Sequence, residues 1–218
     1  MSFDLKPAEL RVLGVLIEKS LTQPAYYPMT INAIVNACNQ KTNREPVTAY
    51  TDSEVSAAMA SLRRREWADQ APPERNERSI KFKHEIEAKF DWNASQRALM
   101  AELMLRGPQT LGELRSRAGR MSHLGTTDYA RDLLQELETA DPPLVIELPR
   151  EPGRSARRFA HLLGGEIPVL SHNQSAALGP PTMAVSEATE DQSALETRVA
   201  ALEDRVIRLE KMITDLRV

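Results

Sequence analysis

The residues best suited to chemistry lie between positions 36 and 46, where the sequence reads NACNQKTNREP. Cys38, the only cysteine of the chain, is followed there by a lysine, an arginine and a glutamate. A thiol beside cations can lose its proton and act as a nucleophile. The stretch could therefore be a catalytic loop, a contact to nucleic acid, or a polar turn between two helices.

The other side chains that could take part in catalysis are not arranged for it. The four histidines are scattered, with no cysteine or carboxylate at metal-ligand spacing: His84, His123, His161 and His172. The sequence has no glycine-rich phosphate loop and no nucleophile elbow. Its carboxylates fall on expected helix faces and first turns, where solvation and capping account for them. We therefore predict a non-enzymatic protein with no catalytic residues, no metal and no organic cofactor.

Three helices and a hairpin are predicted to surround this stretch. Apolar residues recur every three or four positions in three segments, which is typical of amphipathic helices. The third segment begins with a capping box formed by Thr51 and Glu54. The predicted helices cover residues 7–21, 30–38 and 51–65, and the predicted hairpin pairs residues 67–70 with residues 80–83. This order of elements predicts a winged helix-turn-helix domain over residues 1–91.

The same order of elements recurs in residues 92–163. A second capping box, Thr110 with Glu113, opens the helix that corresponds to residues 30–38. The apolar spacing is repeated: Leu111, Leu114 and Ala118 match Ile31, Ile34 and Cys38, and Ala130, Leu133, Leu134 and Leu137 match Val55, Ala58, Met59 and Leu62. Two strands follow at residues 144–148 and 158–162. The sequence predicts a mainly α fold with small β-hairpins, in tandem winged helix-turn-helix domains with separate cores.

The remaining residues divide into a linker and a heptad-patterned helix. Residues 164–190 are rich in Gly, Pro, Ser and Ala without a period, which predicts a flexible linker. In residues 191–218 the apolar positions alternate at spacings of four and three: Leu195, Val199, Leu202, Val206, Leu209, Ile213 and Leu216. Every a position is β-branched and every d position is leucine, which favours a parallel two-stranded coiled coil. We predict a homodimer through this helix; the alternative is a single helix docked on its own domains.

The predicted elements also account for Cys38. The residue lies on the apolar face of the second helix, and its counterpart in the repeat is Ala118, so both positions suit a small buried side chain. We therefore predict a structural cysteine, followed by Asn39 ending the helix in a left-handed conformation. Local hydrogen bonds are expected to hold the long turn together at Asn43, Arg44 and Glu45.

Several motifs together resemble a known family. The stretch NACNQKTNREP has LRVLGVLIEKSLTQP before it and LRGPQTLGELRSRAGR and RFAHLL after it. In this combination, over residues 5–163, the chain resembles the YceH-type family of uncharacterised bacterial proteins. The resemblance implies tandem winged-helix domains, often with a heptad-patterned C-terminal helix, in a bacterial cytoplasm. It implies no activity and supplies no site residues.

Composition limits the function further. The 218 residues carry 28 Lys and Arg against 31 Asp and Glu, so the chain lacks the overall positive charge of many nucleic-acid-binding proteins. Eight acidic and five basic residues lie in 187–218, which leaves 23 of each sign in residues 1–186 and allows a local basic patch. A lone cysteine, no signal-peptide pattern and no membrane-length apolar run lead us to expect a cytoplasmic protein.

Contact with nucleic acid is expected from basic ends of the predicted elements. The third helices begin or continue with carboxylates, which repel phosphate. The hairpins carry more cations, although charged tips also serve solubility. The candidate contacts are Arg63 and Arg64 at the end of the third helix, Arg75, Arg78, Lys81 and Lys83 in the first hairpin, and Arg150, Arg154, Arg157 and Arg158 in the second.

These observations favour a dimeric, DNA-associated or transcription-regulatory protein whose wings contact the phosphates of double-stranded DNA. The alternative is a protein–protein interaction scaffold, in which the winged-helix surfaces bind a protein partner and no nucleic acid. Acidic third helices fit that alternative. Both hypotheses share the predicted homodimer and differ in what the domains touch.

Overall fold

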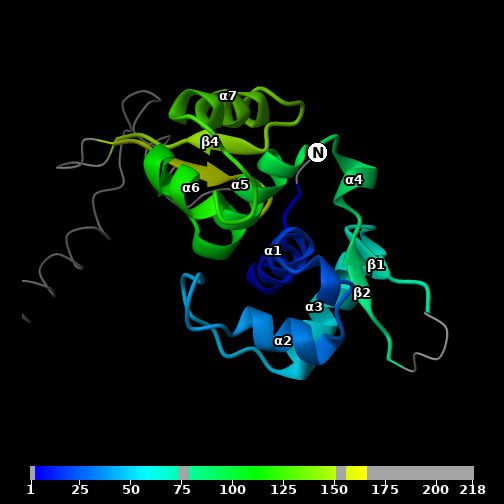
Figure 1. Ribbon diagram of the computed structural model, residues 1–218. Coiled ribbons are helices and arrows are strands. Elements are labelled where there is room, and N and C mark those ends of the chain that lie inside the picture. The colour runs from blue at the N-terminus through cyan, green and yellow to red at the C-terminus, as the bar shows by residue number, and fades with distance from the viewer. Residues whose placement is uncertain (1–2, 74–78, 151–155, 166–218) are drawn as a thin grey trace, which may run out of the picture. The chain divides into compact units, whose positions relative to one another are not determined.

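The computed structural model describes residues 3–73, 79–150 and 156–165. These residues belong to the first of two compact units, which covers residues 1–172; the second covers residues 173–218. The elements are α1 (Pro7–Thr22), η1 (Pro24–Tyr26), α2 (Ile31–Cys38), α3 (Asp52–Arg64), β1 (Ala68–Gln70), β2 (Phe82–His84), α4 (Ile86–Lys89), α5 (Ala94–Arg106), β3 (Gln109–Thr110), α6 (Leu111–Ala118), α7 (Thr127–Glu138), β4 (Val145–Glu147) and β5 (Arg158–His161). The fold is mainly helical with two small antiparallel sheets (Figure 1).

Local hydrogen bonds fix where the helices begin. In the predicted capping box of α3, the Thr51 amide donates to Glu54 Oε2 (2.8 Å) and the Glu54 amide donates to Thr51 Oγ1 (3.3 Å). Thr110 and Glu113 make the same pair of bonds at the start of α6 (2.9 and 3.3 Å). Thr30 caps α2 by accepting from the Ala33 amide. Both predicted capping boxes are therefore confirmed.

The two copies of the repeat have the same topology, and we call residues 3–91 the first half and residues 92–165 the second half. In each half three helices are followed by two antiparallel strands, β1–β2 and β4–β5. A short extra pairing precedes the second helix in both copies: Met29 bridges to Phe82, and Gln109 pairs with Phe159. The eight matched apolar positions of the third helices are all buried, and so are Cys38 and Ala118. The predicted structural role of Cys38 is confirmed.

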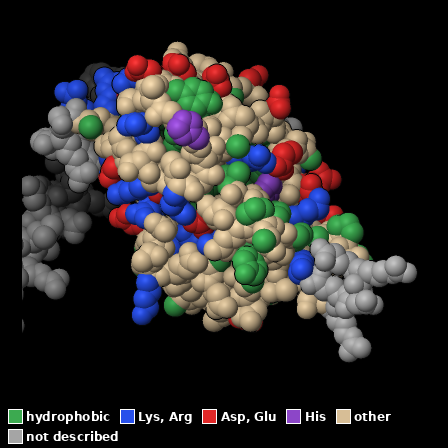
Figure 2. All heavy atoms as spheres, viewed as in Figure 1, with side chains coloured by type: hydrophobic (Ala, Val, Ile, Leu, Met, Phe, Trp, Pro, Cys, Tyr) green, Lys and Arg blue, Asp and Glu red, His purple; other side chains and the backbone are tan. Residues whose placement is uncertain are grey.

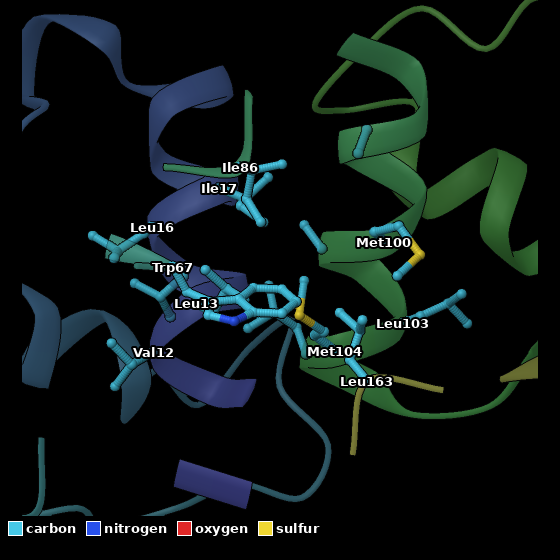
Figure 3. Packing of buried hydrophobic residues seen from close by; sticks show 14 of the residues in the cluster. Val12, Leu13, Leu16, Ile17, Trp67, Ile86, Met100, Leu103, Met104 and Leu163 are labelled. Atoms are coloured by element: carbon cyan, nitrogen blue, oxygen red, sulfur yellow. The ribbon is translucent and has the colours of Figure 1, made fainter. Parts of the chain in front are cut away.

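The core is continuous across the two halves, contrary to the expected pair of separate cores. Helices α1 and α5 pack against each other along their length and are buried on nearly every side. A Cβ added at Gly14 of α1 would lie 3.1 Å from Met104 Cβ of α5, so the glycine permits this close approach. Figure 3 shows Leu13 and Ile17 of α1 facing Met100 and Met104 of α5. Helices that are buried on nearly every side need partners on all sides, which explains why the two cores merge.

The turn after α2 differs from the prediction. Asn39 has φ −91° and is not left-handed, whereas Asn43 has φ 59° and is. The side chain of Asn39 instead pairs with the backbone of Tyr50, accepting from its amide (2.8 Å) and donating to its carbonyl (2.7 Å). An asparagine can satisfy both backbone groups of one residue, and here it closes the turn at its base.

The remaining differences from the sequence prediction concern short elements and the C-terminal segment. The helical turns η1 and α4 were not predicted, because three or four residues are too few to show a helical period. The predicted linker at 164–190 and the predicted coiled coil at 191–218 lie outside the described residues, apart from Gly164 and Gly165. The heptad positions from Leu195 to Leu216 therefore stay a prediction. The boundary predicted between residues 91 and 92 falls between α4 and α5.

Candidate nucleic-acid interface

Helix α3 has an outer face of small side chains that ends in two arginines. The face opposite its buried residues exposes Ser53, Ser56, Ala57, Ala60, Arg63 and Arg64. Small side chains let a helix approach the floor of a groove closely, and arginines can bind phosphate or guanine. The first turn is acidic, and hydrogen bonds from Thr51 lower the pKa of Glu54, which keeps it ionised. Contact to phosphate is therefore favoured at the C-terminal end of α3.

The first hairpin continues this surface. Arg63 Nε lies 3.2 Å from Asp69 Oδ1, so the end of α3 is joined to β1. Lys81, just before β2, and Lys83, on β2, are half-buried, and Lys83 Nζ lies 2.6 Å from Glu85 Oε1. Arg64 is exposed and makes no ion pair with a residue that the structure describes. Arg75 and Arg78 at the tip lie outside the described residues. The structure thus brings Arg63, Arg64 and the base of the first hairpin together.

The second half presents a different surface. Helix α7 exposes Asp128, Asp132 and Glu136, and Figure 2 shows acidic side chains gathered along the edge of the molecule where α7 lies. In the hairpin, Arg157 Nη1 lies 2.8 Å from Glu147 Oε2. The other predicted cations of this half divide as follows: Arg150 is exposed, Arg158 is half-buried on β5, and Arg154 lies outside the described residues. The carboxylates on the outer face of α7 would repel a phosphate backbone on this side of the molecule.

Residues 39–50, which connect α2 to α3, hold the two halves together. Arg44 is fully buried and forms a bidentate pair with Glu18 of α1, at 2.5 and 3.3 Å. Its Nε also donates to the Ala37 carbonyl (3.0 Å). Across the junction, the Glu45 amide donates to the Leu105 carbonyl of α5 (2.9 Å), so the expected local bonding is only part of the arrangement. We call residues 39–50 the junction loop; in Figure 1 it runs from α2 towards the second half.

The pair between Arg44 and Glu18 is part of a larger ion network that reaches from the interior to the surface. Arg120, which follows α6, lies 2.6 Å from Glu18 Oε1 and 3.3 Å from Glu102 Oε2. Glu102, on α5, is fully buried, and Arg106 Nε lies 2.9 Å from its other oxygen, at an angle too poor for a hydrogen bond. Lys and Arg side chains are visible between α6 and the junction loop in Figure 2. Alternating charges let each buried ion keep an opposite neighbour.

This network was missed from the sequence, although one signal was present. Glu18 lies within LGVLIEKSL, where it interrupts an apolar run on a helix with little room for a solvated face. A carboxylate at such a position needs a buried cation. Burial by itself would raise the pKa of Glu18, but the hydrogen bond and charge of Arg44, with Lys19 and Arg120, lower it. The carboxylate is therefore ionised inside the fold.

Cys38 and His84 are buried in the fold, His161 is partly buried and His123 is exposed. Burial raises the pKa of the Cys38 thiol to about 12, although Arg11 and Arg44 partly oppose the shift. Burial also lowers the pKa of His84 and of His161 to about 4. His84 Nε2 lies 3.0 Å from Ser20 Oγ. Within residues 3–73, 79–150 and 156–165, no three His, Cys, Asp or Glu side chains are grouped so as to hold a metal ion.

Comparison with known proteins places the chain in a family. The sequence model of the family described as "Protein of unknown function, DUF480" matches residues 5–154. The chain belongs to this family. It is 43% identical to a UPF0502 protein of Geobacter sulfurreducens over 93% of this chain and 91% of that protein. It is 38% identical to a UPF0502 protein of Pelobacter propionicus over 100% of this chain and 98% of that protein.

Two of the expectations from the sequence can be compared with these findings. The resemblance to the YceH-type family is confirmed, because that name and the family matched here denote the same group of bacterial proteins. Of the helices in the described residues, none is long and apolar enough to cross a membrane.

Proposed function

We propose that the protein is a non-enzymatic, DNA-associated protein of the cytoplasm that binds duplex DNA through its first half. In this proposal each half is a winged helix-turn-helix domain, with α3 and α7 as third helices and the hairpins as wings. The end of α3 and the base of the first hairpin contact phosphates. The heptad-patterned residues 191–218 pair two chains, so that two first halves bind one duplex.

The surface around Arg63 and Arg64 carries the proposal. Past its first turn, the outer face of α3 has small residues and two arginines and no carboxylate. The contact between Arg63 and Asp69 joins this end of the helix to the hairpin that carries Lys81 and Lys83. A helix end and a neighbouring hairpin, both basic, suit a phosphate backbone that runs past them.

The test is binding to a fluorescent random-sequence duplex, followed by anisotropy across a salt series. Affinity should fall steeply with salt, and replacing Arg63 and Arg64 by Ala should lower the slope of log K against log salt by about two. The matched control replaces Arg150 and Arg157 of the second half, and its slope should equal that of the unchanged protein. If only the control variant lowers the slope, the first half is not the binding surface.

A second candidate is a protein–protein scaffold, and the acidic outer face of α7 favours it. Asp128, Asp132 and Glu136 are exposed beside Tyr129, whose side chain is also exposed. An aromatic residue among carboxylates suits a basic protein partner. Absence of duplex binding at low salt, together with retention of a polypeptide by the unchanged protein but not by an Asp128→Lys, Asp132→Lys variant, would favour this candidate over DNA.

A further inference from the structure

A cavity of about 420 Å³ lies on the described part of the molecule and has no role in the proposed DNA contact. Its lining residues come from the N-terminal segment before α1, the α3–β1 connection, the end of α4, and the α7–β4 connection: Phe3, Arg65, Trp67, Lys89, Phe90, Asp141 and Pro142. The volume falls within the range of small-molecule sites, about 300–1,000 Å³. Both halves contribute to the lining, so the cavity exists only in the joined fold.

Aromatic rings form the apolar wall of the cavity. Phe3 meets Trp67 edge-to-face at 5.7 Å between ring centroids, and Trp67 lies 5.6 Å from Phe90. Phe90 is also 5.9 Å from Phe3, so the three rings form a triangle. Such a wall favours a planar aromatic ligand, which can join the offset and edge-to-face contacts. An aliphatic ligand would bury apolar surface in the cavity but would not gain the additional attraction between aromatic rings.

The polar groups of the cavity favour an anion. Two cations, Arg65 and Lys89, and one carboxylate, Asp141, are among the lining residues. Arg65 is engaged, because it donates to the carbonyls of Phe3 and Asp4 in the N-terminal segment and lies 3.5 Å from Glu9 Oε2. Lys89 Nζ is less committed: its ion pair with the exposed Glu66 is 3.8 Å long, and it lies 5.9 Å from the Trp67 ring centroid. A ligand carboxylate can therefore take the place of Glu66.

The same charges argue against a cationic ligand. Aromatic cages bind cations where the ring faces are free. Here Lys89 already lies over the Trp67 ring, and a second cation would meet both Lys89 and Arg65. We infer that this cavity is a binding site for a small aromatic carboxylate, with its ring against the partly exposed rings of Phe3 and Phe90 and its carboxylate on Lys89.

The experiment uses the full chain and three probes: 2-naphthoate, the neutral 2-naphthalenemethanol, and 2-naphthylmethylamine as the cation. Binding is measured by calorimetry, and its place by the indole N–H resonances of the two tryptophans. The resonance of Trp67, which lines the cavity, should shift on titration, and that of Trp92 should shift less. We expect naphthoate to bind tightest and the amine weakest.

Two substitutions should move naphthoate affinity in opposite directions. Lys89→Gln keeps most of the length of the side chain and removes its charge, so naphthoate should bind about fivefold more weakly. Asp141→Asn removes the rim carboxylate, and naphthoate should bind about twofold more tightly. Misfolding cannot produce the second result. Lys41→Gln, an exposed lysine of the junction loop, is the matched control and should change nothing.

The inference is overturned if millimolar naphthoate leaves the Trp67 resonance unmoved. It is also overturned if 2-naphthalenemethanol binds as tightly as naphthoate, or if Lys89→Gln and Asp141→Asn shift the affinity in the same direction. None of these outcomes depends on DNA, so the cavity and the proposed DNA contact are tested separately.

Discussion

Replacing Arg44 by methionine should destabilise the protein by about 3 kcal/mol. The Arg44 side chain has no exposed surface and Glu18 has 1%, so the substitution leaves a buried carboxylate without its main partner. Removing one partner of a buried pair costs about 3–5 kcal/mol, and the lower end applies here because Arg120 still lies 2.6 Å from Glu18. Methionine fills most of the volume, so little of the loss comes from a cavity.

The matched control for this prediction is Arg63→Met. Arg63 also pairs with a carboxylate, Asp69, but the two side chains are 43% and 59% exposed. Solvent screens such pairs, and the expected loss is below about 1 kcal/mol. Urea unfolding of both variants, followed by circular dichroism, gives the free energies from midpoints at an unchanged slope.

The double variant Glu18→Gln, Arg44→Met completes the test. It removes the buried charge as well as its partner, so it should recover part of the loss that Arg44→Met causes. The reasoning is refuted if Arg44→Met costs no more than Arg63→Met. It is also refuted if the double variant loses as much stability as the two single changes added together, or more, because the two charges would then not be coupled as the 2.5 Å contact requires.

Three further predictions address other parts of the chain. Cys38 should resist iodoacetamide in the native protein and react only as fast as the protein unfolds; stoichiometric native alkylation would contradict its burial. Burial lowers the pKa of His84 and of His161 in the folded protein to about 4, so as the pH falls below about 6.5 the unfolded chain binds protons first. The free energy of unfolding should therefore drop by about 2 kcal/mol per histidine at about pH 5. Replacing the exposed His123 by Ala is the control and should leave this loss unchanged. Val206→Asp, which puts a charge at a central a position, should shift the protein towards monomer in sedimentation, and an unchanged dimer would mean that another surface joins the chains.

The repeat could be read from the sequence because its signals are local. A capping box is complete within four residues, and apolar periodicity needs only one helix, so α2, α3, α6 and α7 were expected close to where they lie. The matched positions Cys38 and Ala118 were correctly expected to be small and buried. Agreement between local pattern and global packing is what allows this kind of prediction.

What joins the halves could not be read in the same way. The close approach of α1 and α5 depends on the contact between Gly14 and Met104. These residues are 90 positions apart, so no local sequence pattern predicts the contact. The same holds for Arg44 reaching Glu18 and for the aromatic cavity, whose lining spans Phe3 to Pro142. Pairings of this kind become visible only when the faces that pack together are known, although a lone carboxylate such as Glu18 within an apolar helix is a signal that a partner must exist.

The continuous core also bears on the two candidate functions. In Figure 1, α3 and α7 lie on opposite sides of the pair formed by α1 and α5. Because that pair is buried as one body, the acidic face of α7 is held away from a duplex bound at α3, and its repulsion of phosphate is weakened by distance and salt. An acidic second half is therefore compatible with DNA binding by the first half. A protein partner on α7 and a duplex on α3 would then occupy separate faces of one compact unit.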